Sequence, residues 1–160
     1  MTKFLFAGAV ICLVCSSCTA IMRSYIKEDD SQIPIGFGKE KYTIVVLKHS
    51  KSYNKKVEKR FKKFYTGDYI MAGKEELNTR YNDSAKYRYI LDNSKYYVST
   101  SMPGALPQDR TPGAVSVSFV LKDRVTGETF GADVSSGMYT KVLKAYLQKL
   151  EKVRKKNAQG

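Results

Sequence analysis

The fold of this 160-residue chain is decided by the stretch Tyr42-Thr43-Ile44-Val45-Val46-Leu47-Lys48. Its β-branched apolar centre is typical of a strand that is covered on both faces. The segment that follows, residues 52–64, predicts an amphipathic helix with lysines on its outer surface. Its apolar residues recur at helical spacing, at Tyr53, Val57, Phe61 and Phe64. The strand and the helix together form the opening unit of a domain that mixes sheet and helix.

Further elements follow outward from this unit. Alternating apolar residues, turn signals and one long amphipathic pattern mark them. Gly67 stands where the first helix should stop. Ser135 or Ser136 is expected to cap the last helix. The expected elements are a strand at 68–72, a short helix at 74–78, a hairpin of 87–91 with 95–100 around Asp92-Asn93-Ser94, a hairpin of 115–122 with 128–134 around residues 123–127, and a helix that ends near Lys156.

This order, β-α-β-(short α)-β-β-β-β-α, predicts an α+β fold. We expect a single mixed five-stranded sheet with two amphipathic helices packed on it. The chain is long enough for one domain with one hydrophobic core, which we place at residues 40–156. Residues 18–39 read as a flexible tether, and residues 157–160 as a tail.

A short apolar run follows Lys3 and ends in Ser16-Ser17-Cys18. A run of about eleven apolar residues is too short to cross a bilayer, which takes roughly 20, but it suits a secretory signal. The arrangement resembles a bacterial lipoprotein signal, in which two small residues precede the cysteine that becomes lipidated. The resemblance implies a signal peptide over residues 1–17 and acyl chains on Cys18. The alternatives are an uncleaved anchor, cleavage nearby that leaves a soluble secreted protein, and a cytosolic protein.

The lipoprotein resemblance also implies a location. Thr19, where enteric inner-membrane lipoproteins carry Asp, implies sorting to the outer membrane, facing the periplasm or the cell surface. The partners are then the membrane, through lipid on Cys18, and an envelope protein or anionic envelope polymer. Intracellular nucleic acid is not expected.

Positive charge dominates the chain, with 28 Lys and Arg against 15 Asp and Glu, a net charge of +13. Excess Lys and Arg favour anionic partners, although a solvated basic surface that only keeps the protein soluble is an equal alternative. Lysines on the first helix form the candidate anionic-partner surface: Lys55, Lys56, Lys59, Lys62 and Lys63.

Three features together resemble a periplasmic superfamily of α/β lipoproteins. It includes the N-terminal domain of the Tol translocation protein, the curli secretion channel subunit and the activators of penicillin-binding proteins. The features are the strand-helix unit 42–64, the segment 68–77, and the hairpin 117–128 with its turn Asp123-Arg124-Val125-Thr126-Gly127-Glu128. The resemblance implies a protein-binding or assembly role without catalysis, and it transfers no binding residues.

The sequence holds no catalytic or metal-binding motif of the familiar kinds. His49 is the only histidine, and it follows the first strand, at an edge where open α/β sheets often place ligands. A surface or hydrogen-bonded structural histidine is the favoured interpretation. No metal, cofactor or catalytic residue is therefore expected. The loop at 101–113 is a second candidate for partner binding, because long loops on rigid scaffolds often bind. A disordered loop without a function is an equal alternative. Its candidate residues are Pro103, Gly104, Leu106 and Pro107.

We therefore expect a cell-envelope lipoprotein that acts as a non-enzymatic binding or assembly accessory protein. The alternative is a binding module for lipopolysaccharide, peptidoglycan, another glycan or extracellular nucleic acid. An unrecognised hydrolase is a third, weaker interpretation.

Overall fold

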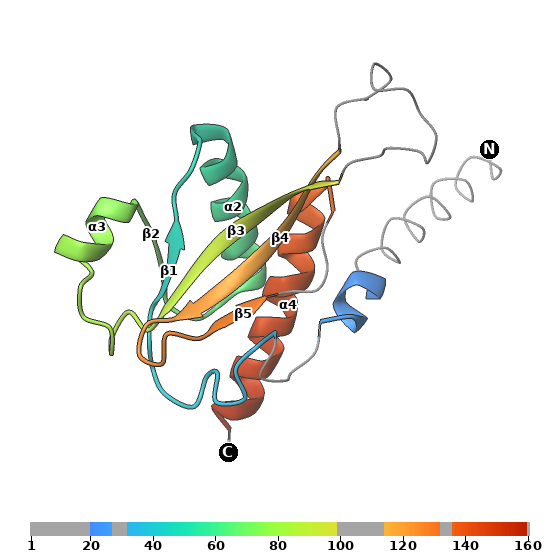
Figure 1. Cartoon of the computed structure of the whole chain (residues 1–160). Coiled ribbons are helices and arrows are strands. Elements are labelled where there is room, and N and C mark those ends of the chain that lie inside the picture. The colour runs from blue at the N-terminus through green and yellow to red at the C-terminus, as the bar shows by residue number, and fades with distance from the viewer. Residues whose placement is uncertain (1–19, 27–31, 99–113, 132–135, 160) are drawn as a thin grey trace, which may run out of the picture.

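The computed structural model describes residues 20–26, 32–98, 114–131 and 136–159 (Figure 1). Its strands form one sheet in the order β2-β1-β3-β4-β5. β1 runs parallel to both of its neighbours, whereas the β3–β4 and β4–β5 pairs are antiparallel. This confirms the predicted α+β fold with a single mixed five-stranded sheet. The strands are β1 (Ile44–Leu47), β2 (Tyr69–Ala72), β3 (Tyr89–Val98), β4 (Ala114–Asp123) and β5 (Thr129–Gly131).

Two long helices, α2 (Lys51–Phe64) and α4 (Tyr139–Asn157), contact each other and cover one face of the sheet (Figure 1). The short helix α3 (Lys74–Thr79) lies apart from them, beside β2 at the edge of the sheet. The core fills the space between the sheet and the two long helices. Its fully buried side chains include Ile44, Val46, Phe61, Phe119, Leu143 and Leu147.

The predicted hairpin around residues 92–94 is wrong. β3 runs without a break from Tyr89 to Val98, and all ten of its residues are in register with β4. Asp92 Oδ1 accepts a hydrogen bond from Nε2 of the His49 ring, at 2.8 Å. Long-range pairing with β4 therefore overrides the local turn preference of Asp, Asn and Ser.

The second predicted hairpin is confirmed as the β4–β5 pair, with Gly127 in its turn at a φ of 78°. This left-handed backbone conformation favours glycine. The stop expected at Gly67 has a different basis. α2 ends at the extended Tyr65, and a Cβ on Gly67 would lie 2.6 Å from the Tyr65 hydroxyl oxygen. Gly67 is thus required by the close approach of this ring.

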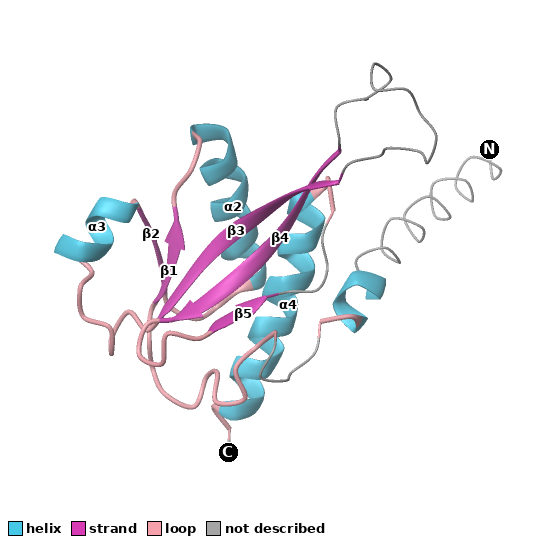
Figure 2. Cartoon of the chain, in the orientation of Figure 1, coloured by secondary structure: helices cyan, strands magenta, loops and turns pink. Residues whose placement is uncertain are grey.

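A flexible tether up to residue 39 is wrong for residues 32–38. Ile33 and Phe37 are fully buried, and Figure 2 shows this loop running past the C-terminal end of α4. The Asn157 side-chain amide donates to the carbonyls of Ile35 and Phe37, at 3.0 and 2.9 Å. Ile33, Ile35 and Phe37 alternate as in a strand, but the residues between them are Pro34, Gly36 and Gly38, which disfavour a strand, so the pattern predicted no element that joins the core.

The last helix begins later than expected. α4 starts at Tyr139, and Ser136 instead forms a bridge to Val117, with N–H···O distances of 3.1 and 3.2 Å. Ser136 Oγ accepts a hydrogen bond from the amide of Met138 at 3.1 Å. Ser135 lies outside the described residues. The serine therefore shapes the turn into α4 and does not cap the helix itself.

Candidate functional site

A basic groove of about 590 Å³ lies between α2 and the start of α4. We use the term basic groove for its nine lining residues. Five of them are Lys or Arg and none is acidic, so the groove presents positive charge to any ligand. The residues are Lys56, Lys59, Arg60, Lys63, Gly137, Met138, Tyr139, Thr140 and Lys141.

The helical repeat places the α2 cations together. Lys56, Lys59, Arg60 and Lys63 stand at positions i, i+3, i+4 and i+7, which share one side of a helix. With a rise of 1.5 Å per residue they span about 10 Å along the helix axis. The neighbouring stripe of α2 buries Val57 and Phe61 in the core, which fixes the direction in which the cations point. The cationic wall is therefore held by core packing.

Aromatic rings, not carboxylates, lie against these cations. Lys56 Nζ is 5.9 Å from the centre of the Tyr139 ring, and Lys63 Nζ is 5.6 Å from that of Phe64. The Arg60 guanidinium and Lys144 Nζ approach the Phe64 ring at 6.0 and 5.5 Å. Among the described residues no ion pair joins the groove cations to an acid. The rings stabilise the charges of Lys56, Arg60 and Lys63 and do not neutralise them.

The start of α4 adds to the positive potential. The residue before the helix, Met138, makes no side-chain capping bond to the first-turn amides. These N–H groups carry the positive end of the helix dipole and lie on the α4 side of the groove. The dipole reinforces the lysines, so the groove suits phosphate or carboxylate groups.

Only some of the five lysines predicted to form the anionic-partner surface line the groove. Lys56, Lys59 and Lys63 line the groove, whereas Lys55 and Lys62 do not. Lys62 Nζ lies 2.7 Å from Glu58 Oε1, and this hydrogen bond and charge raise the pKa of Lys62. Sequence reasoning missed Arg60, which shares the helical face, and Lys141, which only the fold brings near.

His49 lies at the carboxyl end of β1, as predicted, and is hydrogen-bonded to Asp92. Its ring meets that of Tyr53 edge-on at 5.0 Å, and Tyr53 stacks on Tyr139 at 5.5 Å. The His49 amide and carbonyl both bond the side chain of Asn54, at 2.8 and 3.2 Å. Burial raises the pKa of Tyr53 to about 12, although a hydrogen bond with Asn93 lowers it. These contacts brace the junction of β1 and α2, next to the groove.

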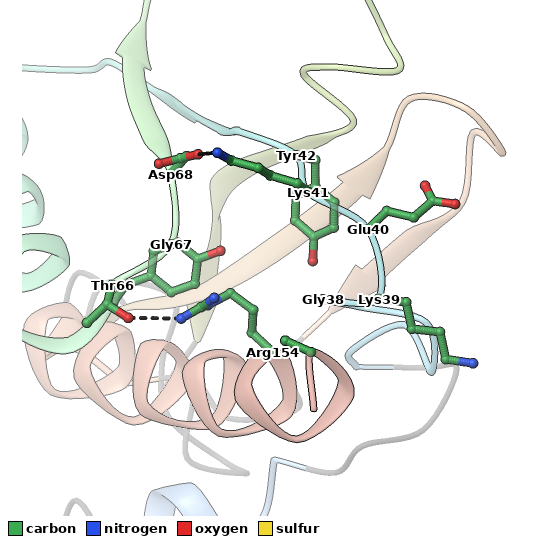
Figure 3. A pocket seen from close by; sticks show the side chains of 11 residues that line it. Gly38, Lys39, Glu40, Lys41, Tyr42, Thr66, Gly67, Asp68 and Arg154 are labelled. Atoms are coloured by element: carbon green, nitrogen blue, oxygen red, sulfur yellow. Dashed lines mark hydrogen bonds and ion pairs between the residues drawn. The ribbon is translucent and has the colours of Figure 1, made fainter. Parts of the chain in front are cut away.

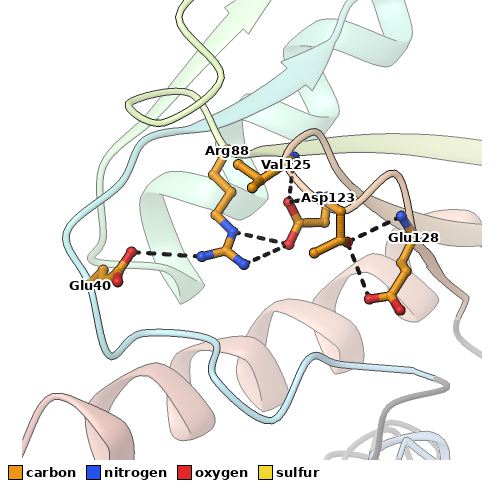
Figure 4. A network of polar contacts seen from close by, with 6 residues as sticks. Glu40, Arg88, Asp123, Val125 and Glu128 are labelled. Atoms are coloured by element: carbon orange, nitrogen blue, oxygen red, sulfur yellow. Dashed lines mark hydrogen bonds and ion pairs between the residues drawn. The ribbon is translucent and has the colours of Figure 1, made fainter.

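The turn at residues 123–128, which carries part of the family resemblance, forms hydrogen bonds and ion pairs within the protein (Figure 4). Asp123 Oδ1 accepts from the Val125 amide at 2.8 Å, and Oδ2 accepts from Arg88 Nε and Nη2 at 3.0 and 2.9 Å. Arg88 also lies 3.7 Å from a carboxylate oxygen of Glu40. The side chains of this turn hold the hairpin to the residue that precedes β3.

The other predicted site residues lie outside the described part of the chain. They are Cys18 and the loop residues Pro103, Gly104, Leu106 and Pro107. In the described ranges, no group of His, Cys, Asp and Glu is arranged to hold a metal ion. The described helices also include none with the length and apolar character needed to span a bilayer.

No known protein family, curated protein or solved structure matches the chain. The resemblance to periplasmic lipoproteins stays a prediction from the sequence.

Proposed function

We propose that this protein is a non-enzymatic binding protein of the bacterial cell envelope that holds an anionic partner in the basic groove. The observation that carries the proposal is the concentration of five cations, with no acid, in one hollow between α2 and α4. Cations in a concave site raise the local concentration of anionic ligands and speed their association.

An envelope polymer suits the groove better than an acidic protein does. Protein interfaces centre on buried apolar and aromatic anchors. Of the large apolar side chains exposed in the described residues, only Met138 lines the groove, with 54% of its surface exposed. A ligand bound there gains mainly from charge. Phosphates of lipopolysaccharide and carboxylates of peptidoglycan carry the required charge.

The location follows from the amino-terminal sequence. The apolar run and Ser16-Ser17-Cys18 favour export and lipidation of Cys18. Two or more acyl chains hold a protein firmly on a membrane, since each buried methylene contributes about 0.8 kcal/mol. We propose the outer membrane, where the groove meets lipid head groups and cell-wall polymers.

Charge reversal on α2 tests the proposal. We expect Lys59→Glu combined with Lys63→Glu to weaken binding to purified lipopolysaccharide or to cell-wall sacculi about tenfold or more, since each cation near an anionic surface contributes about 1 kcal/mol. The matched control combines Lys74→Glu and Lys152→Glu, two exposed lysines outside the groove, which changes the net charge equally.

Titrations at several salt concentrations complete the test. Binding of the wild type should weaken steeply as salt rises, as for other polyanion complexes. An equal loss in the control pair would show that net charge alone attracts the ligand, and the groove would then have no special role. Tight, salt-insensitive capture of a protein instead of a polymer would also reject the proposal.

A further inference from the structure

The first described segment, residues 20–26, exposes two apolar side chains a short way along the chain from Cys18. Residues 20–24 form one helical turn. Ile21 is 56% exposed and Tyr25 is 63% exposed. They stand four residues apart, so they share one side of the turn. We call these two side chains the apolar pair.

The other side of the segment is packed on the domain. Ile26 is 1% exposed and belongs to the hydrophobic core, and Met22 packs against the same core. These two residues are also four apart, so their burial turns the apolar pair outward. Because the core holds the segment, the apolar pair has a fixed place on the domain surface. The flexible tether predicted for residues 18–39 is therefore wrong for residues 20–26 as well.

Other large apolar side chains are exposed in the described residues, but they lie elsewhere. They are Ile35 in the loop of residues 32–38, Val125 in the β4–β5 turn and Met138 in the basic groove. Figure 1 places residues 20–26 and the β4–β5 turn on opposite sides of the molecule. Single exposed apolar residues are common on protein surfaces. The position of the apolar pair in the chain, more than its size, therefore indicates its partner.

The short distance to Cys18 decides which partner the apolar pair meets. Ile21 is three residues after Cys18, and a fully extended chain covers at most about 3.6 Å per residue, or about 11 Å in all. With acyl chains on Cys18, this cysteine lies in the head-group layer of the membrane. Tyr25 is one helical turn beyond Ile21, about 6 Å along the axis. The apolar pair is thus kept beside the lipid, whichever way the intervening chain runs.

The side chains of the segment suit a head-group layer. Tyrosine is enriched where a membrane meets water, because its ring is apolar and its hydroxyl is polar. Arg23 lies between the two members of the apolar pair in the sequence, is exposed, and forms no ion pair with any described residue. Its guanidinium is attracted to the phosphates of anionic lipids. Segments that lie in a membrane interface combine apolar side chains with Lys or Arg in this way.

We propose that Ile21 and Tyr25 enter the head-group layer of the membrane that holds Cys18, and that they dock one side of the domain on the lipid. The proposal rests on the lipidation of Cys18 in the proposed function and adds a second contact with the same membrane. The acyl chains limit the distance of the domain from the membrane, and the apolar pair sets its orientation. A docked domain does not turn freely about its anchor, so the basic groove keeps one orientation relative to the membrane.

A tryptophan at position 25 tests the docking, because the chain has no tryptophan of its own. Tyr25→Trp keeps an amphipathic ring at this exposed position. The full-length variant is made in cells, purified from the membrane, and reconstituted into vesicles of phosphatidylethanolamine and phosphatidylglycerol. The matched control is Val125→Trp, at a position that is 58% exposed on the opposite side of the molecule. The intact mass of each sample shows whether Cys18 carries acyl chains.

We expect the emission of Tyr25→Trp to shift to shorter wavelength in the vesicles and to be quenched by brominated lipids, because its ring leaves water. The emission of Val125→Trp should remain that of a ring in water and should be quenched by acrylamide. Ile21→Ser, added to Tyr25→Trp, should weaken docking about fivefold, measured from the fraction of emission that brominated lipids quench, because the isoleucine surface no longer enters the lipid.

Four results would overturn the proposal. If the samples carry no acyl chains, the membrane location and the docking are both wrong. If the protein is acylated but Tyr25→Trp stays accessible to acrylamide, the docking alone is wrong. Equal quenching of both tryptophan variants by brominated lipids would show that the domain meets the membrane without a preferred side. A shift in emission that brominated lipids do not quench, and that dilution removes, would assign the apolar pair to contact with a second copy of the chain.

Discussion

Glu151 joins α4 to the segment that follows α2. Its side chain accepts hydrogen bonds from the amide and the hydroxyl of Thr66, at 3.3 and 2.5 Å, and from Arg154. The residue is only 8% exposed. Burial raises the pKa of Glu151, but the bonds from Arg154 and Thr66 outweigh this effect and lower it to about 2. The charged form of this carboxylate therefore stabilises the fold.

The stability of the protein should depend on this carboxylate in acid. Because its pKa is lower in the folded state than the ordinary value of 4.5, its contribution is complete above about pH 5 and is lost as the pH falls toward 2. We expect Glu151→Gln to lower the free energy of unfolding by about 2 kcal/mol at pH 7 and to flatten this acid dependence.

Urea unfolding at a series of pH values measures both effects. The control is Glu58→Gln, which breaks the surface pair with Lys62 and should cost less than about 0.5 kcal/mol. If Glu151→Gln kept the same loss of stability between pH 5 and 2 as the wild type, another group would be responsible.

At the scale of elements, the loop of residues 32–38 contacts the end of α4 through a glycine. Gly38 has a φ of 95°, and an added Cβ would lie 2.5 Å from Cα of Arg154. A side chain there would meet both a strained backbone and the main chain of the helix. The approach of loop to helix thus depends on the absence of a side chain.

Substitution at this contact should be costly. We expect Gly38→Ala to lower the free energy of unfolding by about 2–4 kcal/mol, from the left-handed backbone and the clash together. Gly36→Ala is the matched control, because a Cβ there meets nothing within 4 Å and should change stability by less than about 1 kcal/mol. Equal effects of the two substitutions, measured by thermal or urea unfolding, would contradict the packing described for the loop.

The elements also show where sequence patterns succeed. The strand-helix unit, the β4–β5 hairpin and the apolar face of α4 were predictable, because each has a clear period or turn signal. The unbroken course of β3 through Asp92-Asn93-Ser94 was not predictable, since pairing of β3 with β4 joins residues that are far apart in sequence. The burial of Phe37 was hidden for a similar reason, because its partners Tyr89 of β3 and Asn157 of α4 are far from it in sequence.

Sequence spacing likewise predicts one part of the candidate sites, and only the fold brings the other part together. Helical spacing places Lys56, Lys59 and Lys63 on one side of α2, and the same rule could have added Arg60. The other wall of the groove comes from residues 137–141, which no local pattern links to α2. The cavity lined by residues 38–42, residues 65–68, Arg154 and Ala158 is assembled from three distant segments (Figure 3), and no spacing in the sequence predicts it.

At the scale of the whole molecule, two hollows lie at opposite ends of α4. The basic groove is at its start and the smaller cavity at its last turns. An excess of Lys and Arg over Asp and Glu spreads over the chain, but the groove is where described cations gather without acids. The identity of the anionic partner depends on the compartment, because the same groove inside a cell would meet nucleic acid.

The compartment is therefore the most direct test of the account. Cells that make the wild type and Cys18→Ala are fractionated, and the intact mass of each product is measured. We predict that the wild type is in the membrane fraction at the mass of residues 18–160 with acyl chains, and that Cys18→Ala is not. A wild type found soluble, at the mass of the whole chain, would contradict an envelope function and point the basic groove toward intracellular nucleic acid.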